Sequence, residues 1–564
     1  MRRRPYQRDQ ANAVFSEFQQ VNSTLVVSPT GTGKTILAAN IAYRVVNPPP
    51  PQLPKRVMFL AHRKELIYQA KDKIEKMTGL RAEIEMGDQR VGGTDSLFTK
   101  QPPIVVSSVQ TQCSGGDGGG RMTKFDPSQF GLLIIDEAVH ATSPIYRRII
   151  DYYRTNPDLK IVGITACPDR ADEEALGQVF ESVAYDYEIL DAIHDGWIVP
   201  VDQQMVTVAD LDFSRVRTTA GDLNGADLSA IMESEHMLQE IAGPTIEIVG
   251  DKRTIVFTAS VKHAEDLAAI LNRHRTGMAE WVCGMTEDDK RKDILARFAD
   301  GRTQVVTNCS VLTEGFDNPA VEVIVMGRPT KSRNLYAQMC GRSLRPLPGI
   351  VDGLETAEER KAAIAASPKK SALILDFVGN SGKHKLMTSA DILGGKESQE
   401  VLDRAIARAK QGRVRMDQVL DEEEEKLNQE RRQQDEEREE RRLADIARRA
   451  RLIASAKYSK QSVNPFDVLQ ITPASTRGWH EGKTLTEKQR ELLRKQGIDP
   501  DSMPYAQAKQ LIGVIFDRWN KKLCSYKQSV LLKKRGLPTD VSFEEASRQI
   551  TEIALRENWA KRVA

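Results

Sequence analysis

The sequence predicts an α/β protein with two parallel-sheet domains in tandem, then a charged helix and a small all-α repeat module. Short apolar, β-branched runs bounded by turn residues alternate with amphipathic helical stretches, which is typical of a parallel sheet covered on both faces. The pattern occurs twice, and the composition then changes sharply. The runs are LVVS, RVMFLA, PIVVSS, LLIIDEA and KIVGITA, then TIVFTA (254–259), QVVTNC (304–309), VEVIVMG (321–327) and ALILDF (372–377).

The chain of 564 residues is too long for one core, so several domains are expected. We place the first α/β domain at 1–197 and the second at 198–395. Within the second, we interpret 200–250 as a linker and an entry helix. A charged helical spacer is expected at 396–460, and a basic helical module at 461–564.

The spacer is predicted from its charge. Between residues 421 and 450, 20 of 30 residues are charged, with both signs mixed. Pairs such as Glu437 and Arg441 lie four residues apart, where a helix brings them together. The segment lacks a sustained apolar stripe, which favours a solvated helix over a coiled coil. A contact with nucleic acid or a partner is the alternative.

The last hundred residues contain an internal repeat of about 39 residues. Residues 486–512 align with 525–550, and each copy reads as helix, glycine stop, loop and helix. Residues 456–564 hold 20 Lys and Arg against 12 Asp and Glu, a net charge of +8. The sequence leaves two interpretations open for this module: a protein-binding module or a DNA-binding one.

The bulk composition excludes several classes. The formal net charge is +2, so any basic surface is local. The six cysteines form no CxxC pair, which argues against a zinc site and favours reduced thiols. No apolar run resembles a signal peptide or a membrane span. We therefore expect a cytoplasmic protein without membrane contact, with a monomer favoured.

The stretch SPTGTGKT (28–35) follows the apolar run 24–27. A glycine-rich turn between a buried strand and a helix exposes backbone N–H groups that bind phosphate. Gly31 and Gly33 let the backbone close around the anion, Lys34 reaches the β and γ oxygens, and the Thr35 hydroxyl ligates Mg²⁺. Ser28 stands where many such loops have glycine. The loop predicts ATP with Mg²⁺ as the bound group.

Two further motifs complete a hydrolytic site. The strand LLII ends in Asp136 and Glu137, where one carboxylate can hold Mg²⁺ and the next can orient water. In QMCGRSLRP (338–346), Arg342 and Arg345 share one helix face. Arginines from a neighbouring domain stabilise charge on a γ-phosphate during transfer. Lys34, Asp136, Glu137, Arg342 and Arg345 are therefore the predicted catalytic set.

Taken together, the motifs resemble those of a superfamily 2 helicase or translocase, with two RecA-like domains and ATP between them. Eight motifs stand in the family's order across residues 4–346. They are RPYQ (4–7), SPTGTGKT, AHRKELIYQ (61–69), SSVQT (107–111), DEAVH (136–140), TACP (165–168), TEGFDNP (313–319) and QMCGRSLR. Several of them resemble RadD-type repair ATPases, restriction-type helicase subunits and phage-encoded DNA helicases.

The resemblance implies roles by motif position. Adenine recognition falls to Gln7, with Arg4 and Tyr6 beside it. The implied nucleotide-binding residues are Arg4, Gln7, Thr30, Gly31, Thr32, Gly33, Lys34, Thr35, Gly315 and Asp317, with Thr35 and Asp136 on Mg²⁺. The implied strand contacts are Arg63, Ser108, Gln110 and Thr313, and the implied coupling residues are Thr165 and Gln338.

One departure concerns the second motif, which has Val139 where the family has histidine. His140 follows and would point to the opposite side of an extended chain. Coupling through that histidine is therefore in question, whereas hydrolysis through Glu137 is not. The cysteines of RadD-type tails are absent, so no metal beyond Mg²⁺ is expected.

The resulting hypothesis is an ATP-dependent DNA helicase or translocase acting in replication, recombination or repair. Three alternatives remain open at this stage. The chain could act on RNA, although its motif forms lean to DNA. Its ATPase could instead regulate docking of a protein partner through 461–564. It could also be the motor subunit of a restriction enzyme.

Overall fold

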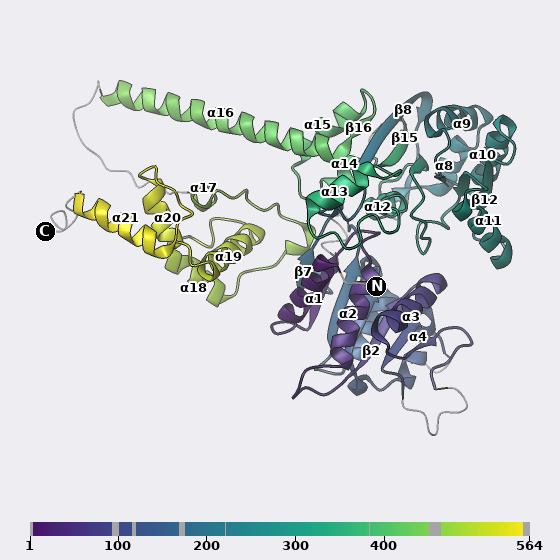
Figure 1. Cartoon of the computed structure of the whole chain (residues 1–564), viewed down its shortest axis with the longest axis horizontal. Helices are drawn as coiled ribbons and strands as arrows, with labels where there is room; N and C mark the ends of the chain where they lie inside the picture. The colour runs from purple at the N-terminus through teal and green to yellow at the C-terminus, as the bar shows by residue number, and fades with distance from the viewer. Residues whose placement is uncertain are drawn as a thin grey trace. The chain divides into compact units, whose positions relative to one another are not determined.

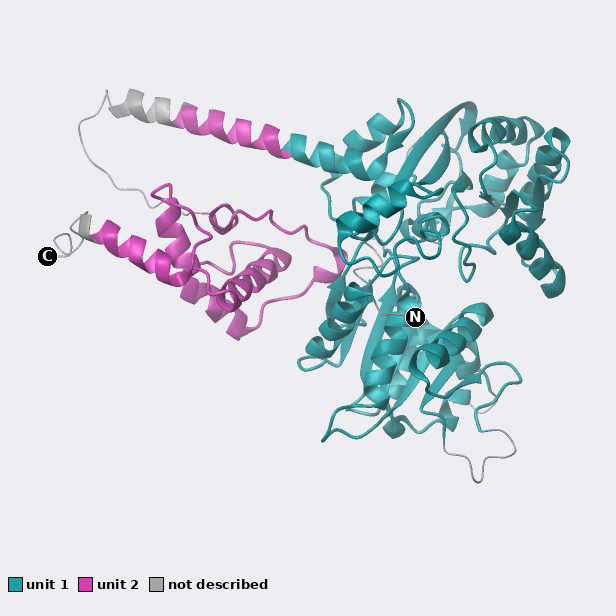
Figure 2. Ribbon diagram, viewed as in Figure 1, with its two compact units in different colours: residues 1–427 teal, residues 428–564 magenta. Residues whose placement is uncertain are grey.

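The computed structural model describes residues 4–92, 101–115, 120–168, 175–219, 221–382, 384–450 and 464–556. It divides into two compact units, residues 1–427 and 428–564 (Figure 2). The first unit contains two seven-stranded sheets, and the second is helical in its described part. The α/β class with two parallel-sheet domains and C-terminal helices is thus confirmed. Residues 116–119 and residues 451–463, where the predicted spacer ends and the predicted basic module begins, lie outside the described ranges.

The first sheet is parallel throughout, with strand order β3-β4-β2-β5-β6-β1-β7. Strands β1 and β4 are buried at every position, and β2, β5 and β6 at most positions, because helices cover both faces (Figure 1). The strands are β1 (Ser23–Val27), β2 (Arg56–Ala61), β3 (Ala82–Glu85), β4 (Ile104–Ser108), β5 (Phe130–Asp136), β6 (Lys160–Thr165) and β7 (Ser182–Asp186). The helices are α1 (Pro5–Glu17), α2 (Lys34–Val46), α3 (Lys64–Thr78), α4 (Val109–Cys113), α5 (Pro144–Tyr153) and α7 (Ile189–His194).

The second sheet has the order β12-β13-β11-β14-β15-β8-β16, and only its edge strand β16 pairs antiparallel. Its strands are β8 (Val201–Asp212), β11 (Thr254–Thr258), β12 (Ala279–Val282), β13 (Val305–Asn308), β14 (Val323–Gly327), β15 (Ala372–Asn380) and β16 (Val414–Arg415). A short hairpin joins β9 (Thr218–Thr219) to β10 (Asp222–Leu223). The helices are α8 (Gly225–Met232), α9 (Glu235–Val249), α10 (Val261–His274), α11 (Asp288–Asp300), α12 (Arg333–Cys340), α13 (Ala357–Ala366) and α14 (Ser389–Leu393).

The segment predicted as a linker at 200–250 is instead largely built into the second domain. Its first part is the long strand β8, which pairs in parallel with β15 over most of its length. The sequence hides this strand because it carries polar residues at buried positions. Gln203 is fully buried, and its Nε2 donates to Oδ2 of Asp376 at 2.6 Å. A hydrogen bond inside the sheet thus replaces the apolar contact that the pattern would require.

The spacer predicted from residue 396 begins later than expected. Helix α15 (Gln399–Ala409) buries Val401 and Ala405 in the core of the second sheet, and β16 extends that sheet. Helix α16 (Met416–Ala450) buries Met416 and Leu420 in the same core. Its side chains at 431–440 are all exposed. The solvated part of the helix therefore starts beyond residue 427, because apolar side chains in the first three turns are buried in this core.

The C-terminal unit repeats one helical pattern. Helices α18 (Glu487–Gln496) and α20 (Tyr526–Lys533) each begin with a capping box, Thr486 with Gln489 and Ser525 with Gln528. The chain then turns at Gly497 and at Gly536, both with positive φ. Each copy ends in a second helix, α19 (Tyr505–Asn520) or α21 (Phe543–Arg556). The short helix α17 (Pro465–Leu469) precedes both copies.

Within the described ranges, the helices are all too short or too polar to serve as a membrane span.

Asp376 provides a test of the second core. Its carboxyl group is fully buried and accepts hydrogen bonds from Tyr336 and Gln203, and burial raises its pKa to about 6. A raised pKa stabilises the fold below the unfolded value, and this stability is lost as the pH rises through the folded value. Asp376→Asn should therefore stabilise the second domain by about 3 kcal/mol near pH 8, because the neutral amide oxygen accepts the same hydrogen bonds. The difference should vanish near pH 4, and thermal unfolding at both pH values would measure it.

The control is Asp251→Asn, which removes a carboxylate that is 96% exposed. This change should leave the unfolding temperature nearly constant at both pH values. If Asp376→Asn instead lowers the unfolding temperature equally at both pH values, the carboxyl group stays ionised even near pH 4, and the assignment of a raised pKa is wrong.

Candidate active site

A pocket lies between the two sheets of the first unit, at the carboxyl ends of their strands. It is lined by the phosphate loop, by the ends of α3 and β5, and by two loops of the second domain. The lining residues are Thr30, Gly31, Gly33, Lys34, Thr35, Leu66, Gln69, Lys73, Asp136, Glu137, Glu314, Gly315, Phe316, Asp317, Gly341, Arg342 and Arg345. Thus 11 of the predicted nucleotide and catalytic residues share one pocket.

The phosphate loop has the backbone of an anion cradle. Gly31 and Gly33 adopt φ of 91° and 87°, values that favour glycine, and α2 begins directly at Lys34. A Cβ atom added at Gly33 would lie 2.7 Å from Nε2 of Gln7. The helix N-terminus adds partial positive charge to this cradle. These features fit a triphosphate with its divalent ion, which is the group predicted for this loop.

The loop is held from behind by α1. The side chains of Tyr6 and Gln7 both donate to the carbonyl oxygen of Thr32, Gln7 at 2.9 Å. Ser28, which replaces the usual glycine, is buried, and its hydroxyl lies 2.9 Å from the hydroxyl of Thr32. The departure at Ser28 therefore gives the loop an internal hydrogen bond. Arg4 lies 4.8 Å from the ring centre of Trp197, and so sits outside the pocket lining.

The acidic pair stands opposite the lysine of the loop. Nζ of Lys34 lies 2.7 Å from Oε1 of Glu137. Burial, and then the adjacent charge of Glu137, raises the pKa of Asp136 to about 6. Glu137 itself has a φ of 48°, a left-handed conformation that is unusual for a side chain of this size. This strain turns the chain sharply after β5 and brings both carboxylates to the pocket.

The two arginines come from the other side. Arg342 is half-buried, and its Nη1 donates to the carbonyl oxygen of Phe316 at 2.6 Å. Burial lowers the pKa of Arg342 to about 10, which leaves it charged near neutral pH. Arg345 forms an ion pair with Asp317. Its Cγ would lie 3.4 Å from a Cβ at Gly31, so this arginine approaches the phosphate loop directly.

Two pocket residues on α3 escaped the sequence reasoning. Nε2 of Gln69 donates to the carbonyl oxygen of Gly315 at 2.6 Å, which joins the two domains. Lys73 adds a fourth cation to the pocket, beside Lys34, Arg342 and Arg345, and burial lowers its pKa. Both follow Leu66 at helical spacing, so one face of α3 lines the pocket. The helical spacing of Leu66, Gln69 and Lys73 was the sequence signal that could have identified them as pocket residues.

A second link between the domains combines two histidines with a carboxylate. Glu314 is buried, with Oε2 at 2.8 Å from Nε2 of His62 and 2.9 Å from Nε of Arg63. The His140 ring lies 4.9 Å from that of His62. Ligand atoms of His62, His140 and Glu314 all fall within 4.8 Å, which is compatible with a metal ion. Because Arg63 already neutralises the carboxylate, we interpret this cluster as an ion pair instead of a metal site.

His140 does not lie where the extended-chain argument placed it. The residues after Glu137 form a 3-10 turn, Ala138–Thr142, instead of an extended strand. This turn carries the His140 ring to His62, while Val139 is buried in the core. Burial, and then the charge of His62, lowers the pKa of His140.

The four candidate strand contacts differ in accessibility. Arg63 keeps a third of its side chain exposed, and Gln110 is exposed. In contrast, Ser108 and Thr313 are each 5% exposed. The Ser108 hydroxyl caps α4 by accepting from the backbone N–H of Thr111 at 3.1 Å. Of the four, Arg63 and Gln110 therefore have side chains that a strand can reach.

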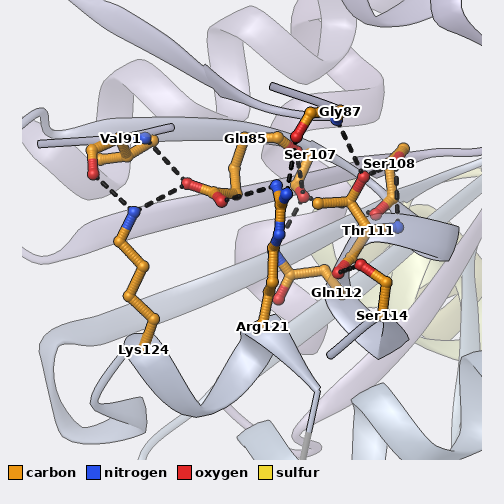
Figure 3. A network of polar contacts seen from close by, with 10 residues as sticks. All are labelled: Glu85, Gly87, Val91, Ser107, Ser108, Thr111, Gln112, Ser114, Arg121 and Lys124. Carbon is orange, nitrogen blue, oxygen red and sulfur yellow. Dashed lines mark hydrogen bonds and ion pairs between the residues drawn. The ribbon is translucent and has the colours of Figure 1, made fainter. Parts of the chain in front are cut away.

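The polar network around Ser108 explains its burial (Figure 3). Glu85 is fully buried at the end of β3 and pairs with Lys124 at 3.0 Å and Arg121 at 3.3 Å. Its backbone carbonyl accepts from the hydroxyl of Ser107, which in turn accepts from Nε2 of Gln112 at 2.8 Å. This chain of contacts fixes the segment that presents Gln110.

The two residues assigned to coupling lie in the interior. Thr165 ends β6 fully buried, and its carbonyl oxygen accepts from the backbone N–H of Ser28 at 2.8 Å. Gln338 is buried on α12, and its carbonyl oxygen accepts from Nε of Arg342 at 3.2 Å. Each residue thus contacts a motif of the pocket through its backbone.

Two family models match the first unit. Residues 1–170 match the model described as type III restriction enzyme, res subunit. Residues 234–346 match the helicase conserved C-terminal domain. The two matches together carry the lining of the pocket.

Individual relatives agree with these models. The candidate ATP-dependent helicase IRC3 of Saccharomyces cerevisiae is 31% identical over 61% of this chain and 49% of its own length. The type I restriction enzyme EcoAI endonuclease subunit of Escherichia coli is 25% identical over 57% of this chain and 42% of its own. A solved HsdR fragment from Vibrio vulnificus is 22% identical, with a TM-score of 0.48 over 67% of this chain and 64% of that one. The chain thus spans about half the length of these curated relatives.

Two parallel sheets that share a pocket with a phosphate loop define a helicase-type nucleotide-binding core. In these two segments the chain is similar to helicase domains, and its motif order resembles that of superfamily 2 helicases.

The pairing at Glu314 makes a prediction for His62. Burial alone lowers the pKa of His62, but the hydrogen bond and charge of Glu314 outweigh it and raise the value above 6.5. Glu314→Gln should therefore bring the pKa of His62 below 6.5, because burial and the Arg63 charge then dominate. Histidine-selective ¹³C NMR against pH would measure it, with His62→Gln assigning the signal.

The matched control is Glu65→Gln, which removes a carboxylate that is 56% exposed on the neighbouring helix. That variant should leave the His62 titration in place. A His62 pKa that stays equal in Glu314→Gln and wild type would contradict the pairing.

Proposed function

We propose that this chain is an ATP-driven motor on DNA, a helicase or translocase that serves replication, recombination or repair. The carrying observation is the convergence of Lys34 and Glu137 from one sheet with Arg342 and Arg345 from the other on one pocket. Such a site requires both domains for hydrolysis, so turnover is coupled to their relative movement. The relatives named as ATP-dependent helicases support this proposal.

In this proposal each side of the pocket has its own task. Lys34 and the N–H groups of the phosphate loop bind the β and γ phosphates. Thr35 and Asp136 would hold Mg²⁺, which supplies charge neutralisation for the phosphates. Glu137 orients the attacking water and takes up its proton. Arg342 and Arg345 stabilise the negative charge that develops on the γ-phosphate.

The remaining assignments are also part of the proposal. Gln7, with Arg4 near it, recognises adenine from behind the loop. Gly315 and Asp317 link the strand-binding side to the nucleotide, because Gly315 bonds Gln69 and Asp317 pairs with Arg345. Thr165 and Gln338 transmit movement through their backbone contacts. The motor comprises residues 1–427, including the α15 and β16 additions, and the helical unit follows it.

The choice of DNA rests on the strand-contacting side and on the relatives. Arg63 and Gln110 are positioned to contact phosphate and sugar, so little sequence preference is expected. A candidate DNA 3′–5′ helicase, Rad25 of Halobacterium salinarum, is 25% identical over 61% of this chain and 52% of its own length. We also propose that the protein acts in the cytoplasm of a bacterial or phage-infected cell, which the Escherichia coli relative supports.

The first test compares ATPase rates without nucleic acid and with single-stranded DNA, duplex DNA, forked DNA and RNA. DNA should stimulate the wild type, whereas Lys34→Ala should be inactive with each substrate. Glu137→Gln should still bind ATP and DNA, with turnover lower by about 10²–10⁴-fold, since it loses the general base. Normal turnover in Glu137→Gln would sink the mechanism.

The same assay decides between the proposal and its rivals. Stronger stimulation by RNA would move the assignment to an RNA helicase. A rate that responds to neither nucleic acid would indicate an ATPase that regulates docking of partners. Deletion of 456–564 should keep the DNA-stimulated rate if the motor is complete without that segment.

A second prediction addresses the arginines. Arg345→Ala should lower the turnover number by about 10³-fold or more, while nucleotide affinity falls much less, because this arginine acts on the transition-state charge. A fluorescent ATP analogue would report the affinity. Arg302→Ala is the control, because Arg302 is a surface residue of the same domain paired with Asp300. Equal loss of affinity and turnover in Arg345→Ala would contradict the assigned role.

A further inference from the structure

The C-terminal unit exposes three aromatic side chains. Phe516 is 48% exposed, Trp519 is 45% exposed and Phe543 is 53% exposed. Phe516 and Trp519 lie one turn apart on α19, with ring centroids 5.2 Å apart at 88°. Aromatic rings usually bury most of their surface, so this exposure calls for a ligand.

Backbone contacts bring the third ring to the other two. The turn after α19 is closed by a hydrogen bond from the N–H of Lys522 to the carbonyl oxygen of Trp519 at 3.1 Å. The N–H of Phe543 donates to the carbonyl oxygen of Lys522 at 2.9 Å, and Leu523 pairs with Ser542. We call the surface formed by Phe516, Trp519, Lys522 and Phe543 the aromatic corner.

Positive charge gathers on one side of the aromatic corner, while Asp517, which pairs with Lys521 at 2.8 Å, and Glu544 adjoin two of its rings in the sequence. Residues 518–535 contain seven Lys and Arg and no Asp or Glu. One of the seven, Arg518, is turned inward and pairs with Asp540. Lys521, Lys522 and Lys527 are exposed. Lys522 adopts a φ of 54°, so this tight turn places a lysine where glycine or asparagine is usual.

The repeat fold does not require these rings. The buried cores of the C-terminal unit contain none of the three. In the alignment that matches Tyr505 with Phe543, the position of Phe516 corresponds to Ala554 in the other copy. The same helical scaffold therefore forms with a small side chain at that place, and the aromatic ring has a purpose other than folding.

We propose that the aromatic corner binds single-stranded nucleic acid, with bases stacked on the rings and phosphates held by Lys521, Lys522 and Lys527. Stacking on aromatic rings beside a basic surface is how proteins hold single strands without sequence preference. Protein interfaces share the aromatic residues but are depleted in lysine, so the charge favours nucleic acid as the occupant. The corner lies outside the two family matches, and its binding does not depend on the motor function.

The main test uses the full chain with Lys34→Ala, so that ATP-driven movement does not contribute. Fluorescence anisotropy with labelled oligo(dT) or oligo(U) of about 16 nucleotides measures affinity. Adding Phe516→Ala and Trp519→Ala should raise Kd by about tenfold or more, since two stacking rings are removed. Leu53→Ala, at a side chain that is 78% exposed in the first unit, is the control and should leave Kd unchanged. Comparing the two oligonucleotides tells whether the strand is DNA or RNA.

Two further variants separate stacking from structural damage. Trp519→Phe keeps a ring and should retain most of the affinity. Lys521→Gln with Lys522→Gln should lower the slope of log affinity against log salt by about 0.7 for each phosphate that the lysines no longer neutralise. Lys488→Gln, an exposed lysine on α18, should keep the wild-type slope.

Photocrosslinking then locates the strand. Oligo(dT) carrying 4-thiothymidine should crosslink to peptides that contain Trp519 or Phe543, in addition to peptides of the motor. The proposal is overturned if these peptides carry no crosslink and the Phe516, Trp519 double variant binds with wild-type affinity. It is also overturned if that variant changes only self-association, measured by sedimentation in the same samples, because the corner then binds a second copy of the chain. If the proposed motor function fails the ATPase test, the anisotropy and crosslinking measurements still test this proposal independently.

Discussion

Two sheets that share no strand must be joined by side chains and loop backbone at one edge, and this constraint organises the first unit. Parallel strands all end on the same side, so the loops that follow β1, β5 and β6 meet those that follow β13 and β14. Polar contacts that cross between the domains include Gln69 with the carbonyl of Gly315, Glu314 with His62 and Arg63, and Arg333 with Glu188. A buried apolar cluster also joins them, because Tyr6 and Trp197 belong to the same cluster as Met339 and Leu344.

The proposed strand contact Arg63 is joined directly to the nucleotide pocket. It pairs with Glu314, which lines the pocket together with Gly315 and Asp317. Because Glu314 is buried between His62 and Arg63, a shift of Arg63 displaces a charge next to the pocket. Burial alone raises the pKa of Glu314, but the hydrogen bond and charges of His62 and Arg63 outweigh it and hold the value near 2, so this link is ionised at physiological pH. The geometry thus gives a short physical path between the two sites.

The amino-acid pattern was sufficient where local rules and burial agree. Each apolar run named from the sequence corresponds to a strand. RVMFLA forms β2, and TIVFTA comprises β11 and the one residue that follows this strand. The pattern did not predict a strand where a polar side chain forms its hydrogen bond inside the core. Gln203 on β8 has the polarity of a surface residue, but in the structure it is buried and donates to Asp376. The sequence did not predict Lys73 and Gln69 as pocket residues for a related reason: charged and polar residues on a helix are usually exposed to solvent, and the sequence alone does not show that this face lines a pocket. The turn that carries His140 depends on the left-handed Glu137, which sequence spacing does not reveal.

In the C-terminal unit, the residues that begin and end the first helix of each copy lie within that copy. Capping boxes start α18 and α20, and a glycine of positive φ follows each helix. Stability that comes from such local devices depends little on the identity of outward-facing residues. One copy can therefore gain or lose a surface, as Phe516 against Ala554 illustrates, at small cost to the fold. Duplication here supplies a frame on which new surfaces can evolve quickly while the first unit stays constant.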